Sequence, residues 1–162
     1  MVHNARIEPR LTQVLPDEHV AVRRFELGDF DLHGRWLLPR LCRTYRHLND
    51  RGAANWLRGI LYNNEWLFLC QPHGVGLAQV MRAETLDPKS MVRERFTWAE
   101  DSNAVEQTRD AAWFYPEYQR WARSLGADPI ILDEGSDVPV EMIREKLGRV
   151  FERKQMFVRI GQ

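Results

Sequence analysis

Cysteine is scarce in this sequence of 162 residues, which contains only Cys42 and Cys70. Their separation fits no metal-ligand spacing and there is no second pair, so neither a zinc site nor a disulfide scaffold is predicted. We expect two free thiols in the core. No run of 18 apolar residues is present, which argues against a membrane span. The first residues lack the apolar stretch of a secretory signal, so we expect a cytoplasmic protein.

An excess of charge of either sign is also missing, because 23 basic residues balance 23 acidic ones. A protein that relies on phosphate contacts usually has a basic excess, so nucleic-acid binding is disfavoured. A local excess of arginine does occur over residues 35–58. That segment is either a surface for an acidic partner or, more simply, a solvated helix face.

Apolar residues are plentiful, at 44% of the chain, and they include six Trp and seven Phe. This length and composition suit one domain with a sizeable core. Residues 1–18 carry two Pro and no clear period, so we predict an irregular arm there and a single domain over 19–162.

Hydrophobic periodicity predicts alternating blocks of strands and helices. Strands are expected at 19–25, 65–70, 75–84, 91–98, 127–132, 149–154 and 156–160. Helices are expected at 32–48, 53–62, 109–125 and 138–147, the first of them kinked or split at Pro39. The connections among the strands between 65 and 98 are too short for crossovers, so these strands should be antiparallel. A two-glycine turn explains Gly74-Val-Gly76.

This order of elements resembles the GNAT (GCN5-related N-acetyltransferase) superfamily of acyltransferases. The sequences of residues 117–132, 143–148 and 156–160 are similar to those of the family's third helix, fourth helix and last strand. The resemblance implies an α/β (α+β) fold, with a mixed, mostly antiparallel sheet covered by helices on both faces. It also implies one common core. We expect that core to contain Trp66, Phe68, Val80, Phe96, Trp121, Leu125, Ile130 and Leu132.

The resemblance further implies acetyl-CoA as cofactor, bound by a Q/R-x-x-G-x-G/A loop whose amides hold the pyrophosphate at a helix N-terminus. Counted back from Trp121, the matching stretch is residues 106–111, in which only Ala111 fits. Arg109 replaces the first glycine, and Glu106 and Asp110 add negative charge. The cofactor contacts that the resemblance implies fall on Thr97, Trp98, Gln107, Thr108, Arg109 and Ala111.

The catalytic residues that the resemblance implies are also altered. Where the family often has a Tyr that protonates the departing thiolate, this sequence has Arg144, which cannot give up a proton near neutral pH. Candidates for the general base are Glu94, Glu100 and Asp101, on or just after the strand at 91–98. Each is otherwise an ordinary solvated carboxylate. No metal site is predicted.

Two functions follow from the resemblance. The first is N-acetyl transfer from acetyl-CoA to a small-molecule or protein amine. The second is a GNAT scaffold without catalysis that binds a protein partner, for which Trp36, Tyr45 and Trp56 are the candidate partner or acceptor residues. Small Trp-rich chains with more Arg than Lys resemble those encoded by tailed bacteriophages. That implies a role in the host cytoplasm, in host takeover or particle assembly.

Overall fold

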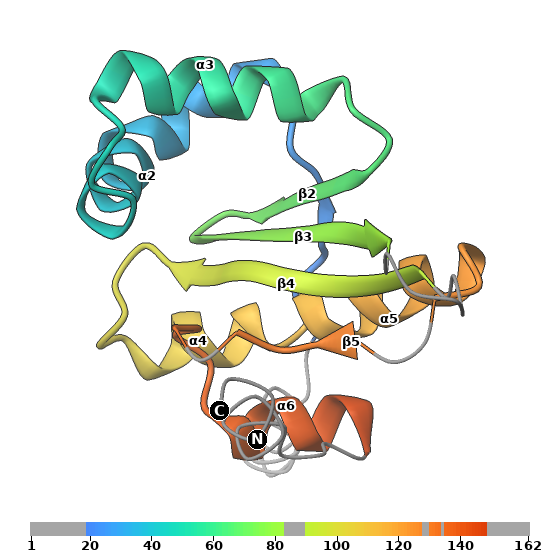
Figure 1. Cartoon of the computed structure of the whole chain (residues 1–162). Coiled ribbons are helices and arrows are strands. Elements are labelled where there is room, and N and C mark those ends of the chain that lie inside the picture. Colours follow the sequence, from blue (N-terminus) through green and yellow to red (C-terminus); the bar gives the residue numbers. More distant parts are fainter. Residues whose placement is uncertain (1–18, 83–89, 128–129, 134, 149–162) are drawn as a thin grey trace, which may run out of the picture.

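A single five-stranded sheet forms the centre of the protein in the computed structural model, which describes residues 19–82, 90–127, 130–133 and 135–148. The strand order is β1-β2-β3-β4-β5 (Figure 1). The strands are β1 (Arg23–Arg24), β2 (Trp66–Gln71), β3 (Gly74–Arg82), β4 (Ser90–Ala99) and β5 (Ile130–Ile131). All neighbours pair antiparallel except β4 and β5, which are parallel. The predicted fold class is therefore confirmed.

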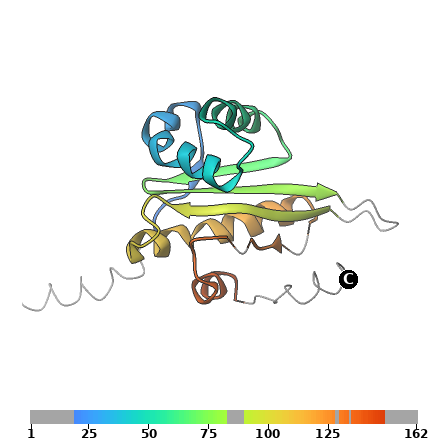
Figure 2. The same cartoon turned by 60° about the vertical axis from the view of Figure 1, so that its left-hand side comes forward.

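Helices cover both faces of the sheet and make three layers (Figure 2). The helical elements are η2 (Leu27–Asp29), α2 (Phe30–Thr44), α3 (Asp50–Leu61), α4 (Val105–Ala111), α5 (Phe114–Ser124) and α6 (Val140–Leu147). Helices α2 and α3 cover one face, and α4, α5 and α6 lie on the other. Within the described residues, no helix is long and apolar enough to cross a membrane.

The single helix predicted at 109–125 is wrong, because the structure has two helices there, separated at Ala112 and Trp113. Pro116 explains the break. It has no N–H to donate to the carbonyl of Ala112, four residues earlier, so one continuous helix cannot form. In the observed structure Pro116 lies in the first turn of α5, where its missing N–H costs nothing.

Two other elements also differ from prediction. Helix α2 spans Phe30–Thr44, earlier than predicted, and it passes through Pro39 as one element, so a split at Pro39 is rejected and a kink stays a prediction. The first strand is limited to Arg23–Arg24. Of the strand predicted at 127–132, the structure shows Ile130–Ile131, while residues 128–129 lie outside the described residues. The predicted arm at 1–18 and the strands predicted at 149–154 and 156–160 lie outside the described residues.

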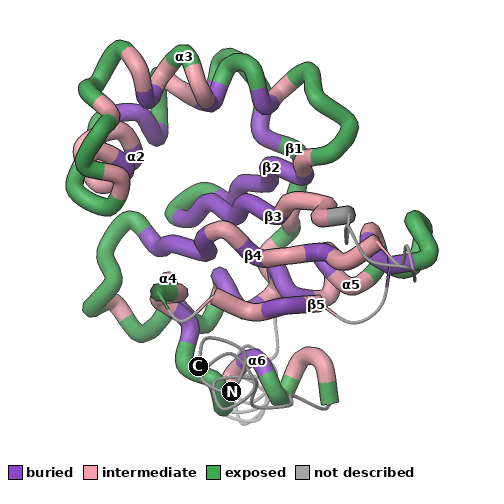
Figure 3. Tube along the Cα trace, in the orientation of Figure 1, coloured by how far each residue is buried: buried purple, intermediate pink, exposed green. Residues whose placement is uncertain are grey.

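Buried residues concentrate in strands β2, β3 and β4 (Figure 3). The sheet separates the buried apolar side chains into two clusters. Phe68 and Phe96 belong to the cluster beneath α2 and α3, whereas Trp121 and Ile130 pack against the cluster beneath α5 and α6. The prediction of one common core is therefore wrong. Leu125, predicted as a core residue, is 44% exposed and follows the end of α5.

Gly76 lies within β3 and not in a turn, so the two-glycine turn predicted at 74–76 is also wrong. A Cβ on Gly76 would lie 2.0 Å from the hydroxyl oxygen of Tyr118 on α5. Glycine is needed here because an aromatic side chain lies directly on the backbone of the strand.

Candidate functional site

Glu94 is a fully buried carboxylate near the middle of β4. It precedes an irregularity in the β3–β4 ladder, where Leu77 and Ala78 pair with Phe96 and Glu94 and leave Arg95 as the extra residue of a bulge. Val92 and Glu94 are two residues apart on β4, so both side chains lie on the same face of the sheet. This face is covered by helix α5, where two tyrosines lie close to Glu94.

Every polar contact of Glu94 is made within the chain. Its Oε2 accepts hydrogen bonds from the hydroxyls of Thr97 and Tyr115, both at 2.5 Å. Its Oε1 accepts one from the backbone N–H of Asp133 at 2.8 Å. Three donors hold this carboxylate, so Glu94 ties β4 to α5 and to the segment after β5.

Two further hydroxyls extend this network. Tyr118 lies 2.8 Å from the Thr97 hydroxyl, and Ser136 lies 2.6 Å from the Tyr115 hydroxyl. When Glu94 is ionised it can only accept, so the protons must point from Tyr118 to Thr97 to Glu94, and from Ser136 to Tyr115 to Glu94. Burial raises the pKa values of both tyrosines, which keeps these donors protonated.

Burial raises the pKa of Glu94 to about 7, although the hydrogen bonds from Thr97, Tyr115 and Asp133 oppose the rise. A carboxyl group with such a pKa suits proton transfer near neutral pH. Its side chain, however, has no exposed surface. In the described structure Glu94 acts as a structural anchor.

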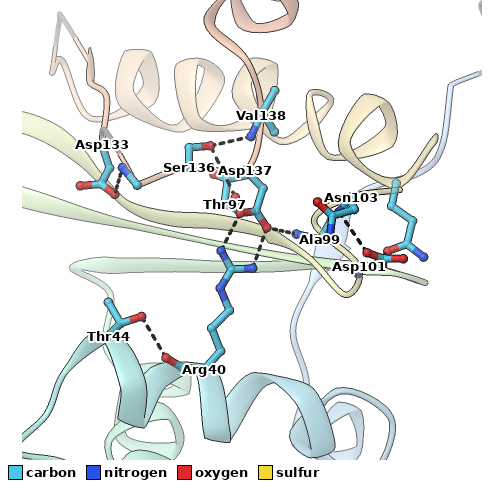
Figure 4. Close-up of polar contacts among 12 residues, drawn as sticks. Arg40, Thr44, Thr97, Ala99, Asp101, Asn103, Asp133, Ser136, Asp137 and Val138 are labelled. Carbon is cyan, nitrogen blue, oxygen red and sulfur yellow. Dashed lines mark hydrogen bonds and ion pairs between the residues drawn. The ribbon is translucent and has the colours of Figure 1, made fainter. Parts of the chain in front are cut away.

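Asp137 occupies the edge of β4 just beyond the end of β5 (Figure 4). Its backbone N–H donates to the carbonyl of Thr97 at 3.0 Å, and its Oδ2 accepts from the N–H of Ala99 at 2.9 Å. Strand β5 pairs with β4 only at Val92 and Arg93. Further along β4, at Thr97 and Ala99, Asp137 makes the backbone contacts that a neighbouring strand would otherwise make.

Arg40 of α2 holds Asp137 from the opposite layer. Its two terminal nitrogens bind the two carboxylate oxygens at 2.6 and 2.5 Å, and its guanidinium lies 4.3 Å from the centre of the buried Trp98 ring. Such a two-pronged pair is geometrically specific. No sequence pattern indicated this contact, because its partners are 97 residues apart and Arg40 lies in the segment expected either to face solvent or to meet an acidic partner.

The loop between β4 and α4 comprises residues 100–104, earlier than the predicted stretch at 106–111. Gln107, Thr108, Arg109 and Ala111 lie within α4 and not in a loop, which corrects the count made from Trp121. That count failed because it assumed one unbroken helix.

Three amides of this loop already have acceptors. The N–H of Asp101 donates to Oε1 of Gln107, that of Asn103 to a carboxylate oxygen of Asp101, and that of Ala104 to the carbonyl of Asp101. The exposed Glu100 and Asp101 bring negative charge to the same loop. A phosphate group would therefore meet acidic side chains here.

The predicted catalytic and partner residues are not brought together. Glu94 faces α5, whereas Trp36, Tyr45 and Trp56 pack against the cluster on the opposite face of the sheet. Glu100 is exposed, with its carboxylate 3.4 Å from the ring of His73. Arg144 is exposed on α6, and no described contact of its side chain connects it to Glu94.

The three predicted partner residues are half-buried and lie among other aromatic rings. The ring centres of Tyr45 and Trp56 are 5.9 Å apart, and those of Trp56 and Trp66 are 5.8 Å apart, both in edge-to-face arrangement. The guanidinium of Arg95 lies 5.9 Å from the Trp66 ring. These aromatics connect α2, α3 and β2.

Comparison with solved structures agrees with this architecture. Glucosamine-6-phosphate N-acetyltransferase from Arabidopsis thaliana superposes with a TM-score of 0.60 and 16% identity, over 83% of this chain and 94% of that one. AAC(6')-Iy, in complex with a bisubstrate analogue of CoA, gives 0.57 and 16%, over 83% and 97%. The chain has the GNAT fold.

A transcriptional regulator from Bacillus halodurans shares the fold equally well, with a TM-score of 0.59 and 14% identity over 82% of this chain and 93% of that one. No family model and no curated protein matches the sequence. At these identities the likeness concerns the fold alone, and activity has to be judged from the site.

Acetyl-CoA, which the fold implies, does not fit the residues described here. The strand edge at Thr97 and Ala99 is bonded by Asp137, and Trp98 is buried between Phe96 and Arg40. The exposed Glu100 and Asp101 bring negative charge to the loop before α4, where a pyrophosphate would lie. No cluster of three or more metal-ligating side chains occurs in the described parts of the chain.

Proposed function

We propose that this chain is a GNAT-fold binding module without acetyltransferase activity, acting through a protein partner. The observation that carries the proposal is the position of Asp137. It supplies both a donor and an acceptor to β4 at the place where the resemblance implies contacts with acetyl-CoA. The chain thereby uses its own residues to fill the cofactor's side of the strand.

The half-buried aromatic residues on α2 and α3 are the proposed contact surface. Trp and Tyr bury a large area while keeping a polar group available, so they recur in binding hot spots. Trp36, Tyr45 and Trp56 therefore remain the predicted partner residues. If the chain is phage-encoded, the partner would be a host protein or a component of the particle.

N-acetyl transfer to an amine is the second candidate, favoured by the pKa of Glu94 near 7. It would require the segment around Ser136 and Asp137 to leave β4, which would also remove two anchors of the Glu94 network. Glu94 would then be the general base, and Glu100 its alternative.

Titration calorimetry with acetyl-CoA separates the two functions. A binding module should show a Kd weaker than about 1 mM, or about −4 kcal/mol. Saturable micromolar binding would reject the proposal and favour the enzyme. In that case Glu94→Gln should lower the acetylation rate about a hundredfold, with Glu100→Gln as the matched comparison.

The partner surface is tested separately, with the full-length chain as bait for a host extract. Tyr45→Ala should lose a partner that the unchanged chain captures, while Arg43→Ala, at an exposed position of α2, should retain it. Equal melting temperatures of both variants would show that folding is intact. Retention of the partner by Tyr45→Ala would reject this surface.

A further inference from the structure

The first strand forms one edge of the sheet in the part of the chain that the structure describes. Strand β1 has only two residues, Arg23 and Arg24, and pairs only with β2 within the described sheet. Both residues are exposed (Figure 3). Unpaired backbone groups at a sheet edge are a template for another extended chain, but a short, charged edge discourages indiscriminate pairing, so a partner here needs complementary charge.

Two cavities flank this edge, one on each face of the sheet. The first has a volume of about 300 Å³ and lies on the α3 side, where Ile60 and Phe68 line it. The second has a volume of about 330 Å³ and lies on the α5 side, where Leu67 and Leu69 line it. Arg24 and Trp121 line both cavities, so the two meet at β1.

Arg24 is the one arginine at this edge without a described carboxylate partner. The neighbouring Arg23 binds Asp29 at 2.6 Å, and Arg120 binds Glu117 at 2.7 Å. The side chain of Arg24 makes no ion pair or hydrogen bond with any described residue. It therefore offers a positive charge between a polar cavity on the α3 side, which Asn63 and Asn64 also line, and a more apolar cavity on the α5 side.

The backbone N–H of Arg24 is also available to a new partner, whereas its carbonyl accepts from Nη1 of Arg23 at 3.1 Å. The N–H of Phe25 donates to the carbonyl of Phe68 at 2.9 Å, toward β2. Backbone groups of successive residues in an antiparallel strand alternate in direction, so the N–H of Arg24 points away from β2.

We propose that this edge binds an extended, acidic-apolar peptide segment of another protein, which pairs with β1 as an additional strand. Successive side chains of an extended strand point to opposite faces, so neighbouring side chains would enter the two cavities in turn. A carboxylate of the peptide would pair with Arg24. This site goes beyond the proposed function and does not depend on it, since it requires only the edge and not the closed cofactor side of β4.

The probe is a short fluorescein-labelled peptide of alternating leucine and glutamate, measured by fluorescence anisotropy at low ionic strength. The unchanged chain should bind it, and Arg24→Glu should weaken binding at least tenfold. Arg24→Lys, which keeps the charge, should bind within a few-fold. Arg43→Glu is the matched control on an exposed part of α2 and should leave binding unchanged.

A second probe with N-methylated backbone amides tests the strand pairing, because the methyl groups prevent the close approach of the peptide backbone to the N–H of Arg24. It should bind at least tenfold more weakly than the first. The proposal is overturned if the unchanged chain does not bind, if Arg24→Glu binds equally well, or if N-methylation has no effect. Self-association through the edge in size-exclusion chromatography, or equal Arg24 dependence for a single-stranded oligonucleotide, would also overturn it.

Discussion

The guanidinium of Arg40 and the carboxylate of Asp137 join the two helical layers at the open end of β4, with nitrogen–oxygen distances of 2.6 and 2.5 Å (Figure 4). Asp137 is nearly buried, at 8% side-chain exposure, and Arg40 retains 22%. Removing one partner of such a pair leaves the other charge poorly solvated, which costs more than the pair itself contributes.

We expect Asp137→Ala to lower the free energy of unfolding by about 2–4 kcal/mol, because it leaves the guanidinium of Arg40 and the N–H of Ala99 without their acceptor. Urea denaturation measures the loss. Glu141→Ala, at an exposed position of α6, should stay within about 0.5 kcal/mol of the unchanged protein. The double variant Arg40→Met/Asp137→Leu should recover part of the loss. An Asp137→Ala protein as stable as the parent would show that the pair is not formed in solution.

Glu94 should make stability fall as pH rises. The pKa of Glu94 is raised from 4.5 to about 7 in the folded protein, so the folded state binds more protons between these values. Its contribution is therefore most favourable below pH 4.5 and is lost as pH rises through 7, by about 3 kcal/mol. The stability of Glu94→Gln relative to the parent should rise by this amount between pH 4.5 and 8. A constant difference across that range would contradict the burial of an ionisable Glu94.

His33 should have the opposite dependence, because burial lowers its pKa below 6.5. Its Nδ1 accepts from the indole N–H of Trp36 at 3.3 Å, and its Nε2 is buried without a described hydrogen-bond partner. The unfolded chain takes up a proton first, so stability should fall as pH drops below 6.5. The stability of His33→Phe, measured relative to the parent, should be higher at pH 5 than at pH 8. Parallel pH profiles for the two proteins would contradict this account.

Gly76→Ala should destabilise the protein by about 1–3 kcal/mol, since the added methyl overlaps the Tyr118 hydroxyl. Adding Tyr118→Phe should recover part of this loss by removing the overlapping oxygen. The matched control is Gly59→Ala within α3, where nothing lies within 4 Å and alanine should stabilise by about 0.5–1 kcal/mol. Thermal or urea unfolding of the four proteins gives the comparison. Equal effects at Gly76 and Gly59 would show that Tyr118 does not lie over β3.

The sequence predicted the individual strands and helices because their periods are local properties, whereas the layers were implied by the resemblance to the GNAT superfamily. The strands at Trp66–Gln71, Gly74–Arg82 and Ser90–Ala99 were expected within two residues at each end. Pro116 was the available signal for the break between α4 and α5, and overlooking it shifted the loop alignment. Local pattern could not give the end of β1, which depends on pairing with β2.

The site was predicted less well than the fold, for a physical reason. Glu94 was selected as a carboxylate on the correct strand, but its burial and its bonds to Tyr115 and Thr97 depend on the packing of α5. Tyr115 and Tyr118 are three residues apart on one helical face, a spacing that indicates a shared contact. Asp137 had no such signal, because its contacts with Thr97, Ala99 and Arg40 are all long-range.

The edge-to-face packing of Tyr45, Trp56 and Trp66 also has a spectroscopic consequence. Two indoles held in a fixed mutual orientation interact through their electronic transitions, and they give a circular-dichroism signal that vanishes when the orientation is lost. The contact between α3 and β2 therefore carries its own optical reporter. Docking of a partner on these aromatics can be followed without any attached dye, and separately from unfolding, which would also remove the backbone signal.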